Sequence, residues 1–280
     1  VPFTPVAGSR LIAADPAAQQ RLLPALQALA EADSLSSIHL LFGDDADLAA
    51  AQAAGWLQRR SVQFHWHNRP GTPYADFDDF LRGLQRDKRR KIAQERRRVA
   101  DAGIRFTVLE GAQIESAHWD FFHRCYANTY AAHGSTPYLT RAFFAAVQRD
   151  LAAHWVLFIA SGGGTPVAAS LLAVDAVRGH AWGRYWGCTR HVPCLHFEAC
   201  YYQPLDWCIA RGFRCFEGGA QGEHKMARGL LPAVTPSAHW LAHPAFADAV
   251  ARYLDREGAG IGAYVDELRE RTPFRAPAAG

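Results

Sequence analysis

The sequence predicts a mixed α/β protein. Stretches with apolar residues at helical spacing alternate with short stretches rich in β-branched and aromatic residues, as expected of interleaved helices and strands. Three consecutive strands are expected at 155–161, 166–174 and 179–188, with helices on either side, and this order favours a mixed sheet. No sequence period of about 20–50 residues is present, so a solenoid is not expected. With 280 residues, 49% of them hydrophobic, the chain can bury one large core or two smaller ones.

The first part of the chain carries two expected helices and two expected strands. Asp15 is placed to cap a helix that begins at Pro16, because its carboxylate can accept from the first-turn N–H groups and proline suits the first helical position. Pro24 lies inside this helix and is expected to kink it. The expected elements are a helix at 16–31, a strand at 36–42, a helix at 44–55 and a strand at 60–68. The loop NRPGTP at 68–73 is a strong turn signal, and we place a domain boundary there.

The rest of the chain alternates in the same way. A long helical stretch ends at Gly103 and has only a thin apolar stripe, and Pro204 is expected to bend a later helix. Besides the three strands named above, the expected elements are one or two helices at 77–103, a strand at 104–111, helices at 114–132, 141–153 and 196–212, strands at 213–219 and 237–242, and a helix at 244–271.

Positive charge is concentrated in one stretch. The formal net charge is only +3, but residues 82–98 hold nine lysines and arginines against Asp87 and Glu95. We favour the interpretation without a binding role, in which these charges form the solvated surface of a helix that has only a thin apolar stripe. The alternative is contact with tRNA or another acidic polymer through residues 86–98, although no aromatic residue suited to base stacking lies in this run.

Cysteines and histidines give no metal-binding pattern in the sequence. None of the six cysteines forms a C-x-x-C pair, and His65 and His67 have no third ligand nearby. No bound metal is therefore predicted. The absence of a signal peptide and of an apolar run of about 20 residues favours a reducing cytoplasm.

Polar residues gather around glycines at 217–228. Glycines allow backbone N–H groups to approach an anion closely, and lysine and arginine can then hold a phosphate or carboxylate. The alternative is a tight turn whose charges are simply solvated. The candidate residues of this group are Glu217, Gly218, Gly219, Gln221, Gly222, Glu223, His224, Lys225 and Arg228.

A second polar group lies just before it. Arg184 falls in an expected central strand, where a charge is costly unless paired, so it either reaches a ligand or pairs with Glu198 or Glu217. Glu198, two residues after His196, is a candidate base or amine anchor, or else a carboxylate favoured by the start of a helix. Tyr185 is a candidate general acid, or else a core tyrosine.

The loop at 133–140 is a candidate for the acceptor pocket. His133 and Tyr138 lie there among turn residues, and binding groups are often placed on such loops.

Several motifs together resemble one family. They are GRYWGC and LHFEACYYQ, GAQGEHKMARGLLP, and upstream QFHWHNRPGTPYADFDDFL, KRRKIAQERRRV and AHGSTPYLT. These motifs resemble the FemAB-like, GNAT-type acyltransferases described as peptidoglycan biosynthesis/recognition proteins. The resemblance runs from about residue 2 to about residue 255, and the family usually has additional sequence before the point where this chain starts, which agrees with a first residue that is not methionine.

The resemblance implies a bacterial transferase with tandem GNAT-like domains. The first would be incomplete, at about 1–70, and the second would span about 74–280. Such folds hold an acyl donor where two neighbouring strands splay apart, and an amine attacks the donor carbonyl directly. The implied donor is acyl-CoA or aminoacyl-tRNA, without a metal, and the implied acceptor is a small-molecule or peptide amine.

One departure from the family pattern keeps other functions open. The usual CoA-binding pattern Q/R-x-x-G-x-G/A is missing, since its nearest equivalent, residues 221–225, lacks the later glycines. This departure favours a non-catalytic module that binds a peptide, a cell-wall fragment or tRNA on the same fold. A nucleic-acid binder built on residues 86–98 is a further, weaker alternative.

Overall fold

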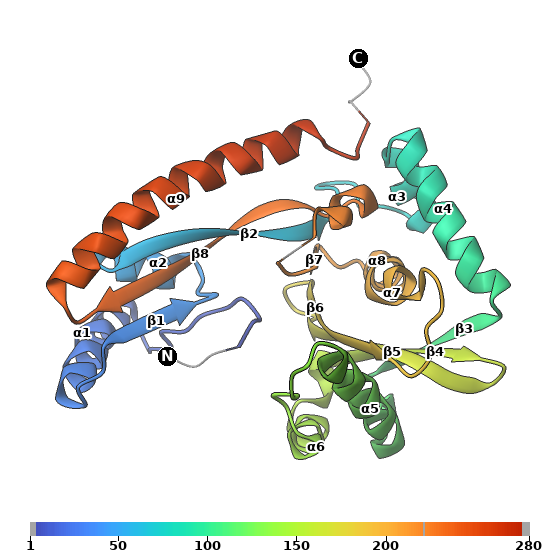
Figure 1. The fold of residues 1–280 in the computed structure, drawn as a ribbon, viewed down its shortest axis with the longest axis horizontal. Helices are drawn as coiled ribbons and strands as arrows, with labels where there is room; N and C mark the ends of the chain where they lie inside the picture. Colours follow the sequence, from blue (N-terminus) through green and yellow to red (C-terminus); the bar gives the residue numbers. More distant parts are fainter. Residues whose placement is uncertain (1–3, 221, 276–280) are drawn as a thin grey trace. The chain divides into compact units, whose positions relative to one another are not determined.

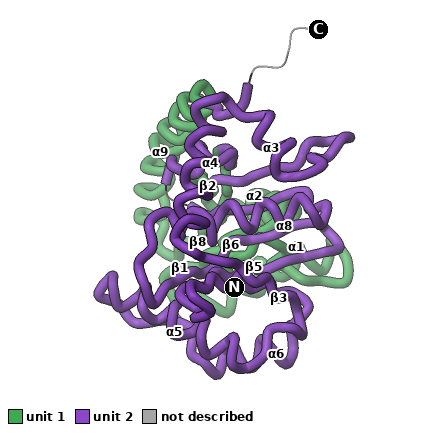
Figure 2. The backbone as a smooth tube through the Cα atoms, turned by 90° about the vertical axis from the view of Figure 1, so that its right-hand side faces the viewer, with its two compact units in different colours: residues 1–63, 232–271 green, residues 64–231, 272–280 purple. Residues whose placement is uncertain are grey.

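The computed structural model describes residues 4–220 and 222–275. The chain divides into two compact units, which we call unit 1 (residues 1–63 and 232–271) and unit 2 (residues 64–231 and 272–280) (Figure 2). The segment 232–271 therefore groups with the start of the chain rather than with the residues that precede it. The proposed tandem division at 1–70 and 74–280 stays a prediction.

Unit 1 combines three strands with three helices. Its strand order is β1-β8-β2, and β1 pairs antiparallel with β8 from Ser37–Leu241 to Leu41–Ser237. Asp15 caps the first helix as expected, with its carboxylate accepting from the Ala18 N–H at 2.7 Å. The bounds are α1 Pro16–Ala32, β1 Ser37–Leu41, α2 Asp45–Ala53, β2 Leu57–His67 (whose last four residues belong to unit 2), β8 Leu231–Leu241 and α9 Pro244–Glu270.

Unit 2 contains a mixed sheet. Its strand order is β2-β7-β6-β5-β4-β3. In the described part of the unit, β6 and β7 run parallel, and the pairs β2–β7, β6–β5, β5–β4 and β4–β3 are antiparallel. The strands are β3 Ile104–Glu110, β4 Trp155–Gly162, β5 Thr165–Asp175, β6 His180–Cys188 and β7 Cys215–Glu217. The predicted mixed α/β class is therefore confirmed.

Helices cover both faces of this sheet (Figure 1). On one face, Phe122 of α5 packs in a core cluster with Leu157 of β4. On the other face, Val99 of α4 and Leu195 of α7 pack with Ala160 of β4. The helical elements of unit 2 are α3 Phe77–Gly83, α4 Arg86–Asp101, η1 Gly111–Gln113, α5 Ser116–Ala132, α6 Arg141–Asp150, η2 Ala152–His154, α7 Leu195–Phe197, η3 Glu198–Tyr202, α8 Gln203–Ala210 and η4 Glu223–Arg228.

Three elements differ from their expected form, and proline explains two of them. The helix expected at 196–212 contains a π turn, η3, in which the Gln203 N–H bonds to the Glu198 carbonyl, five residues back. Pro204 follows at once and has no N–H for the normal helical bond. The last strand begins at Leu231, earlier than expected, because Pro232 and Pro236 hid its first half in the sequence. The glycine-rich segment holds the short helix η4 where we expected only a loop.

No helix in the described ranges has the length and apolarity needed to cross a membrane.

Candidate functional site

The central feature of unit 2 is the place where β6 and β7 separate. The two parallel strands pair from His180–Cys215 to Trp182–Glu217, and β6 then continues to Cys188 paired with β5 but no longer with β7. Beside this point the register between β5 and β6 shifts, since Leu172 faces Gly183 while Leu171 faces Tyr185. Arg184 is thus the extra residue of a bulge, a feature that redirects side chains and is common next to active sites.

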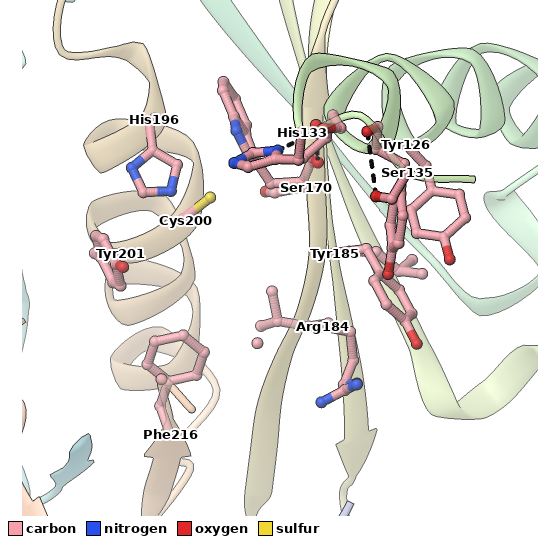
Figure 3. A pocket seen from close by; sticks show the side chains of 17 residues that line it. Tyr126, His133, Ser135, Ser170, Arg184, Tyr185, His196, Cys200, Tyr201 and Phe216 are labelled. Atoms are coloured by element: carbon pink, nitrogen blue, oxygen red, sulfur yellow. Dashed lines mark hydrogen bonds between the residues drawn. The ribbon is translucent and has the colours of Figure 1, made fainter. Parts of the chain in front are cut away.

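A cavity of about 490 Å³ opens at this separation. Figure 3 shows that His196, Cys200 and Tyr201 come from one helical segment, while Arg184 and Tyr185 come from β6. The strand β7 contributes Phe216, and Gly218 follows directly after this strand. The helix α5 with the loop after it contributes Tyr126, Thr129, Tyr130, His133 and Ser135. The helix–sheet interface of unit 2 therefore leaves a ligand-sized space among aromatic side chains.

Three tyrosines form one side of the cavity. The Tyr126 ring lies 5.0 Å from the Tyr185 ring and 4.8 Å from the Tyr130 ring, both edge-to-face. The buried Tyr126 hydroxyl accepts a hydrogen bond from the Leu139 N–H at 3.3 Å, which fixes the ring against the following loop. Edge-to-face packing holds all three rings in place, so this wall is rigid before any ligand arrives.

His196 is a half-buried titratable group of the cavity. Its ring lies 5.3 Å from Trp186 and 5.7 Å from Tyr201, so aromatic surfaces replace water around it. Burial lowers the pKa of His196 to about 4, and nearby positive groups act in the same direction. The imidazole is therefore neutral at pH 7 and can accept a hydrogen bond or a proton.

The other cavity groups offer hydroxyls and a thiol. The Ser170 hydroxyl donates to the Ala199 carbonyl at 2.5 Å and thereby ties β5 to the π turn. Burial raises the pKa of the Cys200 thiol, so this sulfur is protonated and a poor nucleophile at neutral pH. His133 lines the cavity mouth, and its Nδ1 lies 2.7 Å from the Thr129 carbonyl.

Two further candidates lie next to the cavity rather than in its wall. His224 approaches the Tyr201 hydroxyl with its Nε2 at 3.4 Å. Tyr138 is exposed, and its ring meets that of Tyr130 at 5.8 Å. Each therefore touches a cavity-lining tyrosine from outside.

Glu198 does not face the cavity. Its carboxylate receives bonds from Arg96 Nε at 3.2 Å and Gln203 Nε2 at 2.7 Å, on the side of the helix that faces α4. Burial raises the pKa of Glu198, and the Arg96 charge opposes that shift. The ion pair that the sequence suggested between Arg184 and Glu198 is therefore replaced by one with Arg96, because a half-turn of helix separates Glu198 from His196 and Cys200.

Glu217 also points away from the cavity. Strand alternation places it on the face opposite Phe216, where its oxygens lie 3.8 Å from His65 Nε2 and 3.6 Å from His180 Nε2. Burial raises the pKa of Glu217 to about 7. With Cys215 it belongs to a cluster of imidazole, thiol and carboxylate groups that has the spacing of metal ligands.

The two cations of the glycine-rich segment are engaged internally. The Lys225 ammonium donates to the carbonyls of Gly218, Gly219 and Ala220 at 2.7, 3.2 and 2.8 Å. The Arg228 side chain is 2% exposed, and its Nη2 donates to both carboxylate oxygens of Glu95 of α4, at 2.8 and 2.9 Å. In this arrangement both charges fix the segment rather than present themselves to an anion.

The remaining candidates of that segment contribute turns and surface. Gly219 and Gly222 have positive φ angles of 75° and 90°, which favour glycine, and Glu223 is exposed. Gln221 lies outside the described residues. Of the residues singled out in the sequence, the cavity thus brings together Arg184, Tyr185, His196, His133 and Gly218.

Several cavity residues were not singled out in the sequence. Tyr126 and Tyr130 are four residues apart on one helix, and that spacing predicts a shared face. Tyr201 and Cys200 stand within the motif LHFEACYYQ, but only the π turn decides which of its side chains reach the cavity. Ser170 sits in a continuous apolar strand and gave no sequence signal beyond its polarity.

Solved structures share the fold at low sequence identity. The structure of L-PGS from Bacillus licheniformis is 11% identical, with a TM-score of 0.58, over 85% of this chain and 79% of that chain. The crystal structure of FemX is 9% identical, with a TM-score of 0.53, over 85% and 80%. A conserved protein of unknown function from Bacteroides thetaiotaomicron is 10% identical, with a TM-score of 0.53, over 79% and 74%. These likenesses concern the fold alone.

The sequence comparisons give the family. No curated protein sequence matches the chain. The FemAB-like family, described as peptidoglycan biosynthesis/recognition, matches residues 1–276, which is nearly the whole chain. The resemblance noted in the sequence is confirmed, and the chain belongs to the FemAB-like family.

Proposed function

We propose that this protein transfers an acyl or aminoacyl group from an activated donor to an amine, in the synthesis of a cell-wall peptide or a related envelope component. The observation that carries the proposal is the cavity at the separation of β6 and β7, since an extended donor can enter between two parallel strands that stop pairing. The family description of peptidoglycan biosynthesis/recognition and the fold shared with FemX support the same class of reaction.

The proposed chemistry assigns one task to each of two polar cavity residues, His196 and Arg184. The amine nitrogen attacks the donor carbonyl, the new C–N bond forms, and the bond from the carbonyl carbon to the ester oxygen or thioester sulfur breaks. Neutral His196 accepts the proton that the nitrogen loses and passes it to the departing oxygen or sulfur. Arg184, redirected by the bulge, donates to the carbonyl oxygen as negative charge develops there.

The tyrosine wall positions the acyl group. Tyr126, Tyr130 and Tyr185 present rigid ring surfaces, and rigid surfaces hold reacting atoms in place at little cost in entropy. The Tyr185 hydroxyl would donate a hydrogen bond to the departing oxygen or sulfur, and His133 at the mouth would contact the acceptor.

Both donor classes remain part of the proposal. The phosphates of an aminoacyl-tRNA could bind the positively charged surface of α4, where Arg86, Arg90, Lys91, Arg97 and Arg98 are exposed. An acyl-CoA would need an anion site for its phosphates. Lys225 and Arg228 do not offer one in this conformation, because both are engaged internally.

The test is product formation with each donor class. The purified protein is incubated with acyl-CoA of several chain lengths or with aminoacylated tRNA, and with a peptide that ends in a free amine. Mass spectrometry should detect the acyl-peptide with one of the donors. Replacement His196→Ala should lower kcat by about 10²–10⁴-fold, as for loss of a general base.

The matched control is His154→Ala. This histidine bonds to the Val174 carbonyl at 3.1 Å and does not line the cavity, so its replacement should leave kcat close to that of the parent. Absence of product with every donor, from protein that is folded, would reject transfer.

Binding without catalysis is the second candidate. The observation that favours it is that no aspartate or glutamate lines the cavity among the residues the structure describes. A recognition module predicts that a cell-wall peptide binds saturably to the protein, that Tyr130→Ala weakens this binding, and that no donor is consumed.

A further inference from the structure

Five potential metal ligands gather on the sheet face opposite Phe216. His65 and His67 come from β2, Cys215 and Glu217 from β7, and His180 from β6. The register places His65 opposite Glu217, and it places both His67 and His180 opposite Cys215. Paired residues on adjacent strands project to the same side, so all five side chains share one face.

Their ligand atoms are close enough to surround one ion. In the triad of His65, His67 and Cys215, the ligand atoms lie within 4.8 Å of one another, and the same holds for His180, Cys215 and Glu217. Around a tetrahedral zinc ion, nitrogen, oxygen and sulfur ligands lie about 3.3–3.8 Å apart, given metal–ligand distances of about 2.0–2.3 Å. Both triads share the Cys215 sulfur, so small side-chain movements suffice to close a site around it.

We propose that His65, His67 and Cys215 bind a divalent transition metal of the zinc type, with Glu217 as the fourth ligand. A thiolate together with imidazoles selects zinc and similar ions over magnesium or calcium, which prefer oxygen. The Cys215 thiol gives its proton to solvent when the metal–sulfur bond forms.

The two oxygens of Glu217 have different neighbours. Oε2 faces His65 Nε2 at 3.8 Å, on the side of the proposed metal, and Oε1 faces His180 Nε2 at 3.6 Å. A carboxylate that binds a metal through one oxygen usually has a hydrogen-bonding partner on the other oxygen. His180 is that partner for Glu217, and it would orient the carboxylate toward the metal. The site has a way in, because the His67 side chain is exposed.

The position of the site gives it a structural role. Its ligands lie on β2 and β7, and His180 lies on β6 in the first of the three β6–β7 pairs, while Glu217 belongs to the last pair before these strands separate. A bound metal would join these strands just behind Phe216 and would fix where the cavity opens. The proposed metal takes no part in the chemistry of the proposed transfer reaction, because none of its ligands lines the cavity.

The experiment is a Co²⁺ titration of the whole chain after removal of metal with a chelator. We expect saturation at one equivalent, a sulfur-to-cobalt charge-transfer band, and intense visible bands typical of a tetrahedral ion. Zn²⁺ should displace the cobalt and raise the Tm. Absence of the charge-transfer band from folded, reduced protein would overturn the proposal.

Variants separate the site from nonspecific binding. His67→Ala removes an exposed ligand, so the variant should fold, and it should lose saturable binding. His180→Ala should weaken Zn²⁺ binding by about 10–100-fold, because it removes a residue that orients a metal ligand without binding the metal itself. Cys215→Ser should abolish the charge-transfer band.

Two controls should bind as the parent does. His39→Ala removes one member of the His39–His239 pair of unit 1, whose Nδ1 atoms lie 2.7 Å apart. Cys188→Ser removes a half-buried thiol of β6 outside the cluster. Loss of the cobalt spectrum in these controls, or its persistence in His67→Ala, would contradict the proposed ligand set.

Discussion

The cavity and the glycine-rich segment at 218–229 contain similar side chains but use them in opposite ways. In the segment, Lys225 donates to backbone carbonyls and Arg228 is paired with Glu95. In the cavity, Arg184 and His196 face a space that a ligand can fill. A charged or polar residue beside glycines is therefore a poor guide to function by itself, because burial with internal partners makes it part of the framework.

This comparison makes opposite predictions for the two regions. Changes in the segment should reduce folding stability, and changes in the cavity should reduce binding or turnover while the fold persists. The four experiments below are ordered from the largest expected effect to the smallest.

Breaking the buried pair of the segment should have the largest effect. Glu95→Ala leaves Arg228 charged and without its carboxylate partner, and it also removes the acceptor of the Tyr202 hydroxyl. We expect the free energy of unfolding to fall by about 3–5 kcal/mol in urea titrations. The double variant Glu95→Leu/Arg228→Met removes both charges and should recover part of this loss. A loss below about 1 kcal/mol would contradict a framework role.

Removing the cavity arginine should reduce activity and leave stability nearly unchanged. Arg184→Ala should lower kcat/KM for the identified donor by about 10²–10³-fold, because a donor at the developing negative charge is lost. Its free energy of unfolding should change by no more than about 1 kcal/mol, well below the loss expected for Glu95→Ala. The control Arg178→Ala changes an exposed arginine of the same unit, paired with Asp175 at 3.7 Å, and should alter neither quantity. A large stability loss in Arg184→Ala would erase the contrast between the two regions.

The pH dependence of stability should reveal His196. Its folded pKa of about 4 lies below the ordinary value of 6.5, so between these values the unfolded chain binds more protons than the folded one. The contribution of neutral His196 is present above pH 6.5 and is lost as the pH falls through about 4.

The measurement is the unfolding free energy between pH 4 and 7. The decline in the parent should exceed that in His196→Phe by up to about 2–3 kcal/mol. Identical pH profiles would show that His196 is not buried in its neutral form.

Glu198→Gln should have the smallest effect. The sequence made Glu198 a candidate base, whereas the structure engages it with Arg96 and Gln203 outside the cavity. Glutamine keeps the shape and loses the charge, and the Glu198 carboxylate lies outside the cavity, so we expect kcat to stay within about threefold and its pH profile to keep its form. A fall of about 100-fold would restore Glu198 as the base.

Local sequence signals gave most of the elements. Asp15 followed by Pro16 marked the start of α1, and the glycine at 103 marked the end of a helical stretch, because caps and turns depend on single residues. Two of the three elements that differed contain proline, which can either end a helix or strand or be accommodated within it. Pro204 coincides with a π turn inside a helix that continues, and Pro232 and Pro236 are accommodated within β8.

The grouping of the site residues was less predictable. Cys215 to Gly218 lie within one expected strand of the sequence, at 213–219. In the structure, strand alternation places Phe216 and Gly218 at the cavity and Glu217 on the opposite face. His65 and His67 had no third ligand nearby in the sequence, yet the β2–β7 register brings Cys215 to them.

The sequence by itself determined the mixed α/β class, the family, and the part of the chain where chemistry is concentrated, because periodicity, caps and motifs are local properties. Only the tertiary structure decided which side chains share a space. Strand register, the bulge at Arg184 and the π turn at Glu198 each rotate neighbouring residues to different faces. Those rotations depend on partners far along the chain, such as Glu95 for Arg228, and no local pattern contains them.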